Sequence, residues 1–416
     1  MQLKTILNRV EKHRFFVYGR TTLREGKAGL VLDVEIHPRA NSKPFCSGCM
    51  RRRPVYDHLN VRRFEFVPLW GIAVFFLYMM RRVNCRTCGI VVEAVPWAIG
   101  KRSITTSYAW FLAQWARRMS WADVARAFRT SWDNVFRSVD MAVKWGRAHV
   151  NLDGIASIGV DELAWQRGHT YMTVVYQIDQ GCRRLLWIGP GRKLKTLLGF
   201  FRWFDKDKTA KLRFIASDMW KPYLRVIAKK APRALHILDR FHIMSHFSKA
   251  IDEVRADEAR ALKQRGIHVL KGSRWCLLKN PVNLTANQAV KLSTLLRSNL
   301  KTIRSYLLKE EFQIFWTYRS PFWASAFLDW WCRYVMRSRI EPMKRIARML
   351  RTHQDLIFNW FKAKGEISSG AVEGLNNKAK LITRKAYGYR TLRVAEIALY
   401  HALAKLPEPK DLHRFC

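Results

Sequence analysis

Two sets of residues in this sequence have the types and the spacing that metal chemistry requires. The first set consists of four cysteines in two pairs, Cys46-Ser-Gly-Cys49 and Cys85-Arg-Thr-Cys88. Two thiolates that are separated by two residues can both reach one ion, and two such pairs complete a tetrahedral sulfur shell for zinc. The spacing therefore predicts a structural Zn²⁺ site formed by Cys46, Cys49, Cys85 and Cys88.

The second set is acidic. Asp161 and Asp218 each follow a strand-like stretch, 155–160 and 212–216, and Glu373 lies in a later helical stretch. Carboxylate oxygens suit Mg²⁺ or Mn²⁺, and two such ions about 3.5–4 Å apart stabilise both the attacking and the leaving oxygen of a phosphate displacement. Each carboxylate taken alone is better explained as a helix cap or a surface ion pair. Only the set of three predicts a catalytic site with two metal ions.

The chain is strongly basic. Its 75 Lys and Arg against 32 Asp and Glu give a formal net charge of +43, and basic clusters such as 51–53 and 378–390 occur over the whole length. Charge of one sign repels itself in a compact protein unless a partner offsets it. We therefore expect double-stranded DNA as a partner. A surface made basic for solubility, or one that binds anionic lipid, explains the clusters less well.

The sequence predicts a cytoplasmic protein without a membrane partner. No signal peptide opens the chain, and the longest apolar run, Gly71 to Met80, is about half as long as a membrane-spanning helix. Cysteines stay reduced in the cytosol. Outside the two pairs, the isolated cysteines Cys182, Cys276, Cys332 and Cys416 are interpreted as small apolar residues.

Strand-like residues separate the two cysteine pairs. The stretch 61–80 predicts a hairpin between them, and arginines flank both pairs. We interpret 45–98 as a zinc-binding module whose rim contacts phosphate. The alternative is a structural zinc site that does not touch DNA. The predicted contacts are Arg62, Arg63, Arg81 and Arg82.

The pattern after residue 100 is helical. Helices are expected at 105–119, 121–128 and 132–145, and Ser131 has the side chain of an N-cap residue. Two helices joined by so short a break form a helix-turn-helix, whose second helix enters the major groove of DNA. The predicted contacts on that helix are Trp132, Asn134 and Arg137.

Strands dominate the next stretch. They are expected at 155–160, 170–178 and 183–188, after which helix and strand alternate as far as Leu238; this is the order of a mixed α/β sheet. Residues 251–365 are helical and rich in tryptophan. Tryptophans at this density could stack on unpaired bases, but at helical spacing we expect them to pack in a core.

The last structured segment is a helix that carries Glu373 and begins at a capping serine, Ser368 or Ser369. Helical spacing places residues three, four and seven positions apart on one face, so Glu373 shares its face with an amide and two cations. The predicted DNA-backbone contacts of this segment are Asn377, Lys380, Arg384 and Arg390.

Taken together, these motifs resemble the insertion-sequence L-three family of bacterial DDE transposases over nearly the full length of the chain. The departures are small: Leu163 stands where an aromatic residue is frequent, and Trp220 follows Asp218-Met219. The matching stretches are the two cysteine pairs, the helical region 103–143, Ile158-Gly159-Val160-Asp161-Glu162, Ala216-Ser217-Asp218-Met219, Asp239-Arg240-Phe241-His242, Ser369-Gly370-Ala371-Val372-Glu373-Gly374-Leu375-Asn376-Asn377, Arg384 and Tyr387-Gly388-Tyr389-Arg390.

The resemblance implies a ribonuclease-H-like fold in which Asp161, Asp218 and Glu373 are the metal ligands. It also implies that Asp239 and His242 lie near the active site, as in the Asp-x-x-His motif of related enzymes; a core histidine with satisfied hydrogen bonds is the alternative. Glu162 should face away from Asp161, because side chains alternate along a strand, and is interpreted as structural.

The expected fold class is therefore α/β, a ribonuclease-H-like mixed sheet with a helical insertion, preceded by a zinc-binding module and a helix-turn-helix. The predicted domains are an N-terminal segment (1–44), the zinc-binding module (45–98), the helix-turn-helix (99–150), the first part of the catalytic core (151–250), the helical insertion (251–365), the last catalytic helix (366–405) and a tail (406–416).

The expected function is that of a bacterial, nucleoid-associated transposase. Its DNA-binding modules recognise the terminal inverted repeats, and its metal site cuts one strand and joins the freed 3′-OH to target DNA within a homodimer. One alternative is a DNA-binding regulator on an inert scaffold, which the presence of all three carboxylates disfavours. Another is a ribonuclease-H-like nuclease, which the roughly one hundred residues of DNA-binding modules disfavour.

Overall fold

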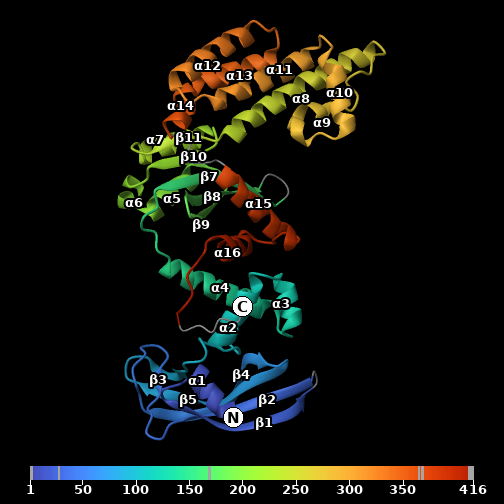
Figure 1. Ribbon diagram of the computed structural model, residues 1–416. Coiled ribbons are helices and arrows are strands. Elements are labelled where there is room, and N and C mark those ends of the chain that lie inside the picture. The colour runs from blue at the N-terminus through green and yellow to red at the C-terminus, as the bar shows by residue number, and fades with distance from the viewer. Residues whose placement is uncertain (1–2, 27–28, 167–169, 364–365, 367–369, 411–416) are drawn as a thin grey trace. The chain divides into compact units, whose positions relative to one another are not determined.

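The protein folds into two compact units (Figure 1). The first joins Met1–Asn151 to Leu381–Cys416, and the second is Leu152–Lys380. The structure is a computed structural model, and it describes residues 3–26, 29–166, 170–363, 366 and 370–410. The C-terminal residues from 381 thus group with the N-terminal part of the chain, whereas the sequence assigned 366–405 to the catalytic core.

A six-stranded sheet forms the N-terminal part of the first unit. Its strand order is β1-β2-β5-β6-β3, and β4 also pairs with β5. Because β2 pairs in parallel with β5, the predicted N-terminal segment and the zinc-binding module share one sheet. The fully buried Trp97 packs against the rings of Phe16, Phe64 and Tyr78. The elements are α1 (Leu3–Val10), β1 (Phe16–Gly26), β2 (Gly29–Pro38), β3 (Phe45–Cys46), β4 (Val55–Leu69), β5 (Ile72–Cys85) and β6 (Gly89–Ala94).

The predicted hairpin between the cysteine pairs is present. β4 and β5 run antiparallel and are joined by the two-residue turn Trp70–Gly71, in which both residues have positive φ. Such turns match the twist of the strands and usually hold Asn or Gly. Here a tryptophan, 91% exposed, stands at the tip.

Three helices follow the sheet, at the positions that the sequence predicts: α2 (Thr106–Ala116), α3 (Trp121–Ala127) and α4 (Trp132–His149). Each begins at a side chain that accepts a hydrogen bond from a backbone N–H in its first turn. The capping residues are Thr105, Ser120 and Ser131.

The C-terminal helix α16 (Leu392–Leu403) packs against α4. Arg147 forms an ion pair with Glu396 at 3.3 Å, and its guanidinium lies over the ring of Tyr400. A Cβ on Gly146 would lie 2.6 Å from Leu406, so the last turns of α4 leave no room for a side chain there. These contacts explain why the C-terminal residues belong to the first unit.

A five-stranded mixed sheet is the framework of the second unit. Its order is β11-β10-β7-β8-β9, where β7, β8 and β9 are antiparallel neighbours and β10 and β11 run parallel to β7. The mixed α/β sheet of the prediction is therefore confirmed. The strands are β7 (Ser157–Gln166), β8 (Thr170–Asp179), β9 (Cys182–Pro190), β10 (Phe214–Ser217) and β11 (Leu235–Leu238).

Helices cover both faces of this sheet. On one face Ile158 and Val160 belong to a core with residues of α5 and α7 such as Phe200. Strand side chains alternate, so Gly159 faces the other side; a Cβ built there would lie 2.3 Å from Cγ2 of Val372 in α15. Glycine therefore permits α15 to approach the sheet. The helices are α5 (Leu194–Phe204), α6 (Lys206–Ala210), α7 (Lys221–Lys230) and α15 (Gly370–Lys385).

Helices α8 to α14 form the insertion between β11 and α15. It starts earlier than predicted, because α8 is one continuous helix across residue 250. Trp331 is buried in the main core, as expected, but Trp275, Trp323 and Trp330 are exposed. The helices are α8 (Arg240–Gln264), α9 (Arg274–Leu278), α10 (Ala286–Leu296), α11 (Lys301–Gln313), α12 (Pro321–Met336), α13 (Glu341–Thr352) and α14 (Gln354–Lys362), with short 3-10 turns η1 (Pro281–Asn283) and η2 (Ile314–Thr317).

A helix that crosses a membrane must be both long and apolar. α8 has 25 residues but carries charged side chains along its length. Within the described ranges, none of the helices has both the length and the apolar character that crossing a membrane requires.

Candidate active site and metal centre

Three neighbouring strands of the second unit bring acidic residues to one edge of the sheet. β10 pairs in parallel with both β7 and β11, and the register aligns the residues that precede Asp161, Asp218 and Asp239. The three carboxyl groups therefore lie side by side where parallel strands gather functional groups. We predicted that this strand ends at Asp161. In the structure β7 continues to Gln166, because β8 still pairs with it there.

Asp161 and Asp218 lie in surroundings that disfavour their negative charge. Burial raises the pKa of both carboxyl groups, and the charge of Asp218 raises the pKa of Asp161 further. His242 acts in the opposite direction on both. Partly desolvated carboxylates of like charge are stabilised by a bound cation. The chemistry of this donor set therefore fits a divalent metal.

Two histidines of α8 lie near Asp218. Asp239 caps this helix by accepting a hydrogen bond from the backbone N–H of Phe241 at 2.8 Å, which places His242 in the first turn and His246 one turn later. Both histidines lower the pKa of Asp218. The buried Nδ1 of His242 has no hydrogen-bond partner in the described part of the chain.

Helix α15 is tied to the acidic edge by Asn376. The amide nitrogen of Asn376 donates a hydrogen bond to the carboxylate of Asp161, and its amide oxygen accepts one from the hydroxyl of Tyr176 at 2.9 Å. Asn376 is buried. Its side chain is thus fixed on both sides and holds the carboxylate of Asp161 in one orientation.

Glu373 lies one turn before Asn376 in α15, with an exposed side chain. Residues three apart are neighbours on a helix, so Glu373 stands next to the Asn376–Asp161 contact. Its carboxylate is not at coordination distance from both aspartates: among the described residues, only the four cysteines place three or more Cys, His, Asp or Glu ligand atoms within 4.8 Å of one another. The predicted cap at Ser368 or Ser369 lies outside the described residues.

Glu162 points to the sheet face opposite the preceding aspartate. It pairs with Arg192 at 3.6 Å, and burial followed by the charge of Asp218 raises its pKa. The guanidinium of Arg192 lies 5.3 Å from the ring centroid of Trp220. Glu162 is therefore close enough to the acidic edge to affect it electrostatically, although sequence reasoning treated it as structural.

The four predicted zinc ligands come together in the first unit. Their Sγ atoms all lie within 4.8 Å of one another, and those of Cys49 and Cys85 are 3.6 Å apart. Zn–S bonds of about 2.3 Å in a tetrahedron separate the sulfurs by about 3.8 Å. The group formed by Cys46, Cys49, Cys85 and Cys88 could therefore bind a zinc ion.

Arg53 supports this cysteine group. Its Nε donates a hydrogen bond to Sγ of Cys85 at 3.3 Å, and this contact is the main reason that the pKa of Cys85 falls to about 5. A Cβ on Gly48 would lie 2.8 Å from Sγ of Cys88, so the first cysteine pair packs tightly on the second. In the sequence, Arg53 belonged to the basic cluster 51–53, but its contact with a cysteine was not predicted.

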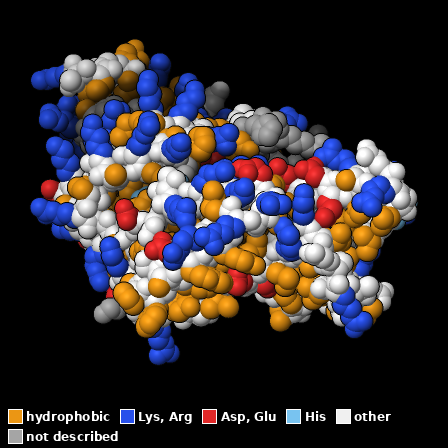
Figure 2. All heavy atoms as spheres, turned by 90° about the horizontal axis from the view of Figure 1, so that it is seen from above, with side chains coloured by type: hydrophobic (Ala, Val, Ile, Leu, Met, Phe, Trp, Pro, Cys, Tyr) orange, Lys and Arg blue, Asp and Glu red, His pale blue; other side chains and the backbone are white. Residues whose placement is uncertain are grey.

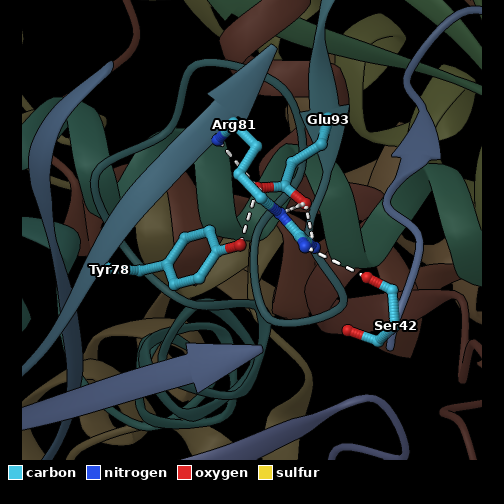
Figure 3. A network of polar contacts seen from close by, with 4 residues as sticks. All are labelled: Ser42, Tyr78, Arg81 and Glu93. Atoms are coloured by element: carbon cyan, nitrogen blue, oxygen red, sulfur yellow. Dashed lines mark hydrogen bonds and ion pairs between the residues drawn. The ribbon is translucent and has the colours of Figure 1, made fainter. Parts of the chain in front are cut away.

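Arg81, one of the predicted DNA contacts, is turned inward (Figure 3). It is 5% exposed, and its guanidinium binds both carboxylate oxygens of Glu93, with Nη2 at 2.7 Å from Oε2. The hydroxyl of Tyr78 donates to the same carboxylate at 2.7 Å, and Nη1 of Arg81 donates to the carbonyl of Ser42. Arg81 therefore cannot reach a phosphate, and this part of the prediction is wrong.

The other three predicted arginines of this module remain accessible. Arg62 donates to the carbonyl of Arg102 at 2.8 Å, Arg63 pairs with Asp33 at 3.0 Å, and Arg82 pairs with Asp57. Exposed ion pairs contribute only about 0–1 kcal/mol. Arg63 and Arg82 can therefore exchange these carboxylates for phosphate groups, whereas the half-buried Arg62 forms no such ion pair.

On α4 the predicted contacts have mixed exposure. Trp132 is 46% exposed and its ring stacks on that of Phe136, while Arg137 is exposed and pairs with Asp133 at 2.8 Å. Asn134 is half-buried, and its amide donates to Thr130 at 3.0 Å. Of the three, Trp132 and Arg137 are the more accessible to a ligand.

The predicted contacts near the C-terminus are all exposed: Asn377, Lys380 and Arg384 on α15, and Arg390 beyond it. The residue that contacts Asp161 is Asn376 and not its neighbour Asn377, because Val372, Leu375, Asn376 and Ala379 form the buried side of the helix.

His246 was not among the predicted site residues. It lies four positions after His242 on α8, and this repeat of histidine on one face of a helix was a signal in the sequence that could have revealed it.

Comparison with known proteins agrees with this arrangement. The sequence profile of a transposase family, of the DDE and ISL3 type, matches residues 158–398. The chain is 31% identical over 367 residues to the transposase for insertion sequence element IS1001 of Bordetella parapertussis, which covers 87% of this chain and 89% of the relative. It is 29% identical over 385 residues to the transposase for insertion sequence element IS1557 of Mycobacterium tuberculosis, covering 86% and 85%.

The family match covers more than half of the chain and includes the mixed sheet, the helical insertion and α15. It therefore also includes Asp161, Asp218 and Glu373. Membership in a DDE family implies a ribonuclease-H-like fold, with which the strand order of the second unit agrees. The chain belongs to the insertion-sequence L-three family of DDE transposases, which are metal-dependent enzymes that act on DNA.

Proposed function

We propose that this transposase cleaves DNA at the ends of an insertion sequence and joins them to target DNA, with Asp161, Asp218 and Glu373 as ligands of two Mg²⁺ or Mn²⁺ ions. One observation carries the proposal: the strand register sets Asp161 beside Asp218, and α15 delivers Glu373 next to the hydrogen bond between Asn376 and Asp161. Divalent ions at this place would stabilise the attacking and the leaving oxygen of the displaced phosphate.

The protein side chains prepare this site. Partial burial of Asp161 and Asp218 weakens the hydration of their carboxylates, which strengthens their attraction for a cation. Asn376 orients Asp161 without bringing a positive charge that would compete with a metal ion. His242 and His246 lower the pKa of Asp218 and so favour the ionised carboxylate that a metal ion requires.

DNA recognition is assigned to both units. In the first unit a structural Zn²⁺ on the four cysteines holds β3, β5 and β6 together, and α4 is the recognition helix of a helix-turn-helix that binds the terminal inverted repeats. In the second, exposed side chains along α15 hold the backbone of the cleaved strand. Joining two ends requires two active sites, so we expect a homodimer on the DNA. The names of the relatives, transposases for insertion sequence elements, support a function on DNA of this kind.

The test uses DNA that carries the element's terminal repeats, incubated with Mg²⁺. Asp161→Asn, Asp218→Asn and Glu373→Gln should each reduce strand cleavage and strand transfer by about 100-fold or more, as expected when a group that stabilises transition-state charge is removed. DNA binding should persist, because the predicted contacts lie elsewhere. Asp257→Asn, an exposed residue of α8 that pairs with Arg260, serves as the matched control. Full strand transfer by any of the three variants would exclude that residue from the site.

A further inference from the structure

Arg192 is an exposed cation in the loop that joins β9 to α5, and 47% of its side chain is accessible. The residue before it is held in place by β8. The backbone N–H of Gly191 donates a hydrogen bond to the carbonyl of Tyr171 at 2.9 Å, and the hydroxyl of Thr173 donates one to the carbonyl of Gly191 at 2.7 Å. These two hydrogen bonds fix the backbone from which the side chain of Arg192 extends.

Two aromatic rings contact the guanidinium of Arg192. Its central carbon lies 4.6 Å from the ring centroid of Tyr171 and 5.3 Å from that of Trp220. The indole N–H of Trp220 also donates to the carbonyl of Arg192 at 3.4 Å. A cation within about 6 Å of a ring centroid is attracted by the ring. The rings therefore restrict this side chain without occupying its hydrogen-bond donors.

The same contacts connect Arg192 with the acidic edge. The backbone N–H of Trp220 donates to Oδ1 of Asp218 at 3.1 Å, and the ring of Trp220 contacts the guanidinium. A second connection runs through Glu162, the residue after Asp161, whose Oε2 lies 3.6 Å from Nη1 of Arg192. Two short chains of contacts thus place Arg192 beside the carboxylates of the proposed metal site.

A DNA phosphate that approaches this edge meets strong negative charge. The edge carries Asp161, Asp218 and Asp239, and both Glu162 and Glu373 lie close to it. Two divalent ions would not neutralise all of these groups when they are ionised, and like charges repel strongly in a partly desolvated site. A fixed cation beside the edge would reduce this repulsion and favour the entry of the phosphate.

Charge alone does not distinguish Arg192 from other basic residues, because the net charge of the chain is +43 and Lys and Arg side chains cover most of the face drawn in Figure 2. Its fixed position and its loose ion pair do. A guanidinium has five N–H donors, and 3.6 Å is longer than the roughly 2.7–2.9 Å of a charge-assisted hydrogen bond. The contact with Glu162 therefore leaves the guanidinium able to bind a phosphate as well.

We propose that Arg192 binds a backbone phosphate of the DNA strand that enters the acidic edge, while Glu162 and the rings of Tyr171 and Trp220 keep its guanidinium in place. A planar guanidinium can donate two parallel hydrogen bonds to one phosphate. The proposal rests on the proposed function, because it takes the acidic edge as the place of cleavage. Arg192 was not among the DNA contacts predicted from the sequence.

The alternative role of Arg192 is to stabilise Glu162, and the two roles predict different effects of Glu162→Gln. If the ion pair itself is required, Glu162→Gln and Arg192→Gln should weaken DNA binding equally, and the double variant should be no worse than either. If Arg192 binds a phosphate, Glu162→Gln removes a competing negative charge and should bind DNA at least as tightly as the parent. Arg192→Gln should then bind about tenfold more weakly in either background, as expected for a lost hydrogen bond between charged groups.

Single-turnover cleavage of the terminal-repeat duplex in Mg²⁺ measures the half-saturating DNA concentration and the maximum rate separately. Arg192→Gln should raise the half-saturating concentration about tenfold and change the maximum rate less, because the contact is made before the chemical step. Arg192→Lys should lie between this variant and the parent, because lysine keeps the charge but not the planar group. The slope of log affinity against log salt should become shallower by about one in Arg192→Gln.

Arg213→Gln is the matched control. Arg213 is also exposed, pairs with Glu366 at 3.2 Å and lies 5.0 Å from the ring centroid of Phe214. It precedes β10, whereas Asp218 follows that strand, so it lies at the end of the strand away from the acidic edge. Arg213→Gln should therefore have the half-saturating concentration of the parent.

Neutral methylphosphonates, introduced one at a time into the duplex, test the contact directly. At one position near the cleavage site the substitution should weaken binding of the parent about tenfold and leave Arg192→Gln unaffected, because the variant has already lost that contact. Equal losses in the parent and in Arg192→Gln at every position, or a normal half-saturating concentration for Arg192→Gln, would overturn the proposal. Full cleavage by Asp161→Asn would instead refute the proposed function, so the two failures are distinguishable.

Discussion

Asn376 illustrates why the type of a single residue matters at the acidic edge. Its amide donates one hydrogen bond to Asp161 and leaves the negative charge in place, whereas a lysine or arginine there would neutralise it. The choice between Asn376 and Asn377 depends on how α15 is rotated about its axis. That rotation follows from the contact of Val372 with Gly159 on a distant strand, so periodicity within the helix could not reveal it.

The raised pKa of Asp218 leads to a prediction about the stability of the protein. Burial raises the pKa of Asp218 in the folded protein above its unfolded value, so its ionised form destabilises the fold at pH values above the folded pKa. Asp218→Asn should therefore raise the melting temperature at pH 7.5 in the presence of a chelator. The expected rise is a few degrees, since about 1 kcal/mol corresponds to about 2–4 °C for domains of about 150–250 residues.

The pH dependence of this gain supplies its control. Both states hold a protonated carboxyl group below the unfolded pKa of Asp218, and the neutral asparagine then has no advantage. The difference in melting temperature should decrease steadily as the pH falls through the folded pKa toward 3.8, the ordinary value of this carboxyl. A variant that is less stable than the parent at pH 7.5 would contradict the role of burial.

At the scale of elements, the alternation of strands and helices in 155–238 was readable from the sequence, because buried strands and amphipathic helices have distinct periods. The sequence did not reveal which side of each strand faces the solvent. Arg81 and Arg82 are adjacent in β5 and must point to opposite faces, so at most one of them could contact DNA. The partner that buries Arg81 is Glu93 on β6, and this long-range pairing is set by the sheet.

The approach of α15 to β7 can be tested at Gly159. The Cβ introduced by Gly159→Ala would lie 2.3 Å from Cγ2 of Val372, which is too close for two carbon atoms. Overpacking of this kind costs about 1–3 kcal/mol, and displacement of α15 should also reduce strand cleavage because Glu373 moves with the helix. Denaturant unfolding and a cleavage assay measure the two effects.

A compensating change provides the control for this prediction. Val372→Ala in the Gly159→Ala background removes the clash and should recover most of the lost stability and cleavage. Gly374→Ala in the same helix meets no atom within 4 Å and should gain up to about 1 kcal/mol from helix propensity. If Gly159→Ala were as stable and active as the parent, α15 would not depend on this contact.

At the scale of the whole molecule, the chain combines a cysteine group in the first unit with an acidic edge in the second. We therefore expect metal removal to act locally. In hydrogen–deuterium exchange on the full chain, a zinc chelator should accelerate exchange in β3, the end of β5 and β6, which carry or flank the cysteines. Strands β7, β8 and β10 should change little. Equal acceleration in β7 and β8, or none in β6, would contradict the assignment of a structural zinc ion.

Glu373 is the critical member of the proposed metal site, because strand register brings the two aspartates together whereas the glutamate lies on a separate helix. The most direct measurement is strand cleavage by Glu373→Cys in Mg²⁺ and in Mn²⁺. A thiolate is a poor ligand for the hard Mg²⁺ ion, and softer ions tolerate it better. If Glu373 binds a catalytic ion, the variant should be inactive in Mg²⁺ and regain at least about tenfold more activity in Mn²⁺ than Glu373→Ala does. Equal activity of the cysteine and alanine variants in Mn²⁺ would contradict the role of Glu373 as a metal ligand.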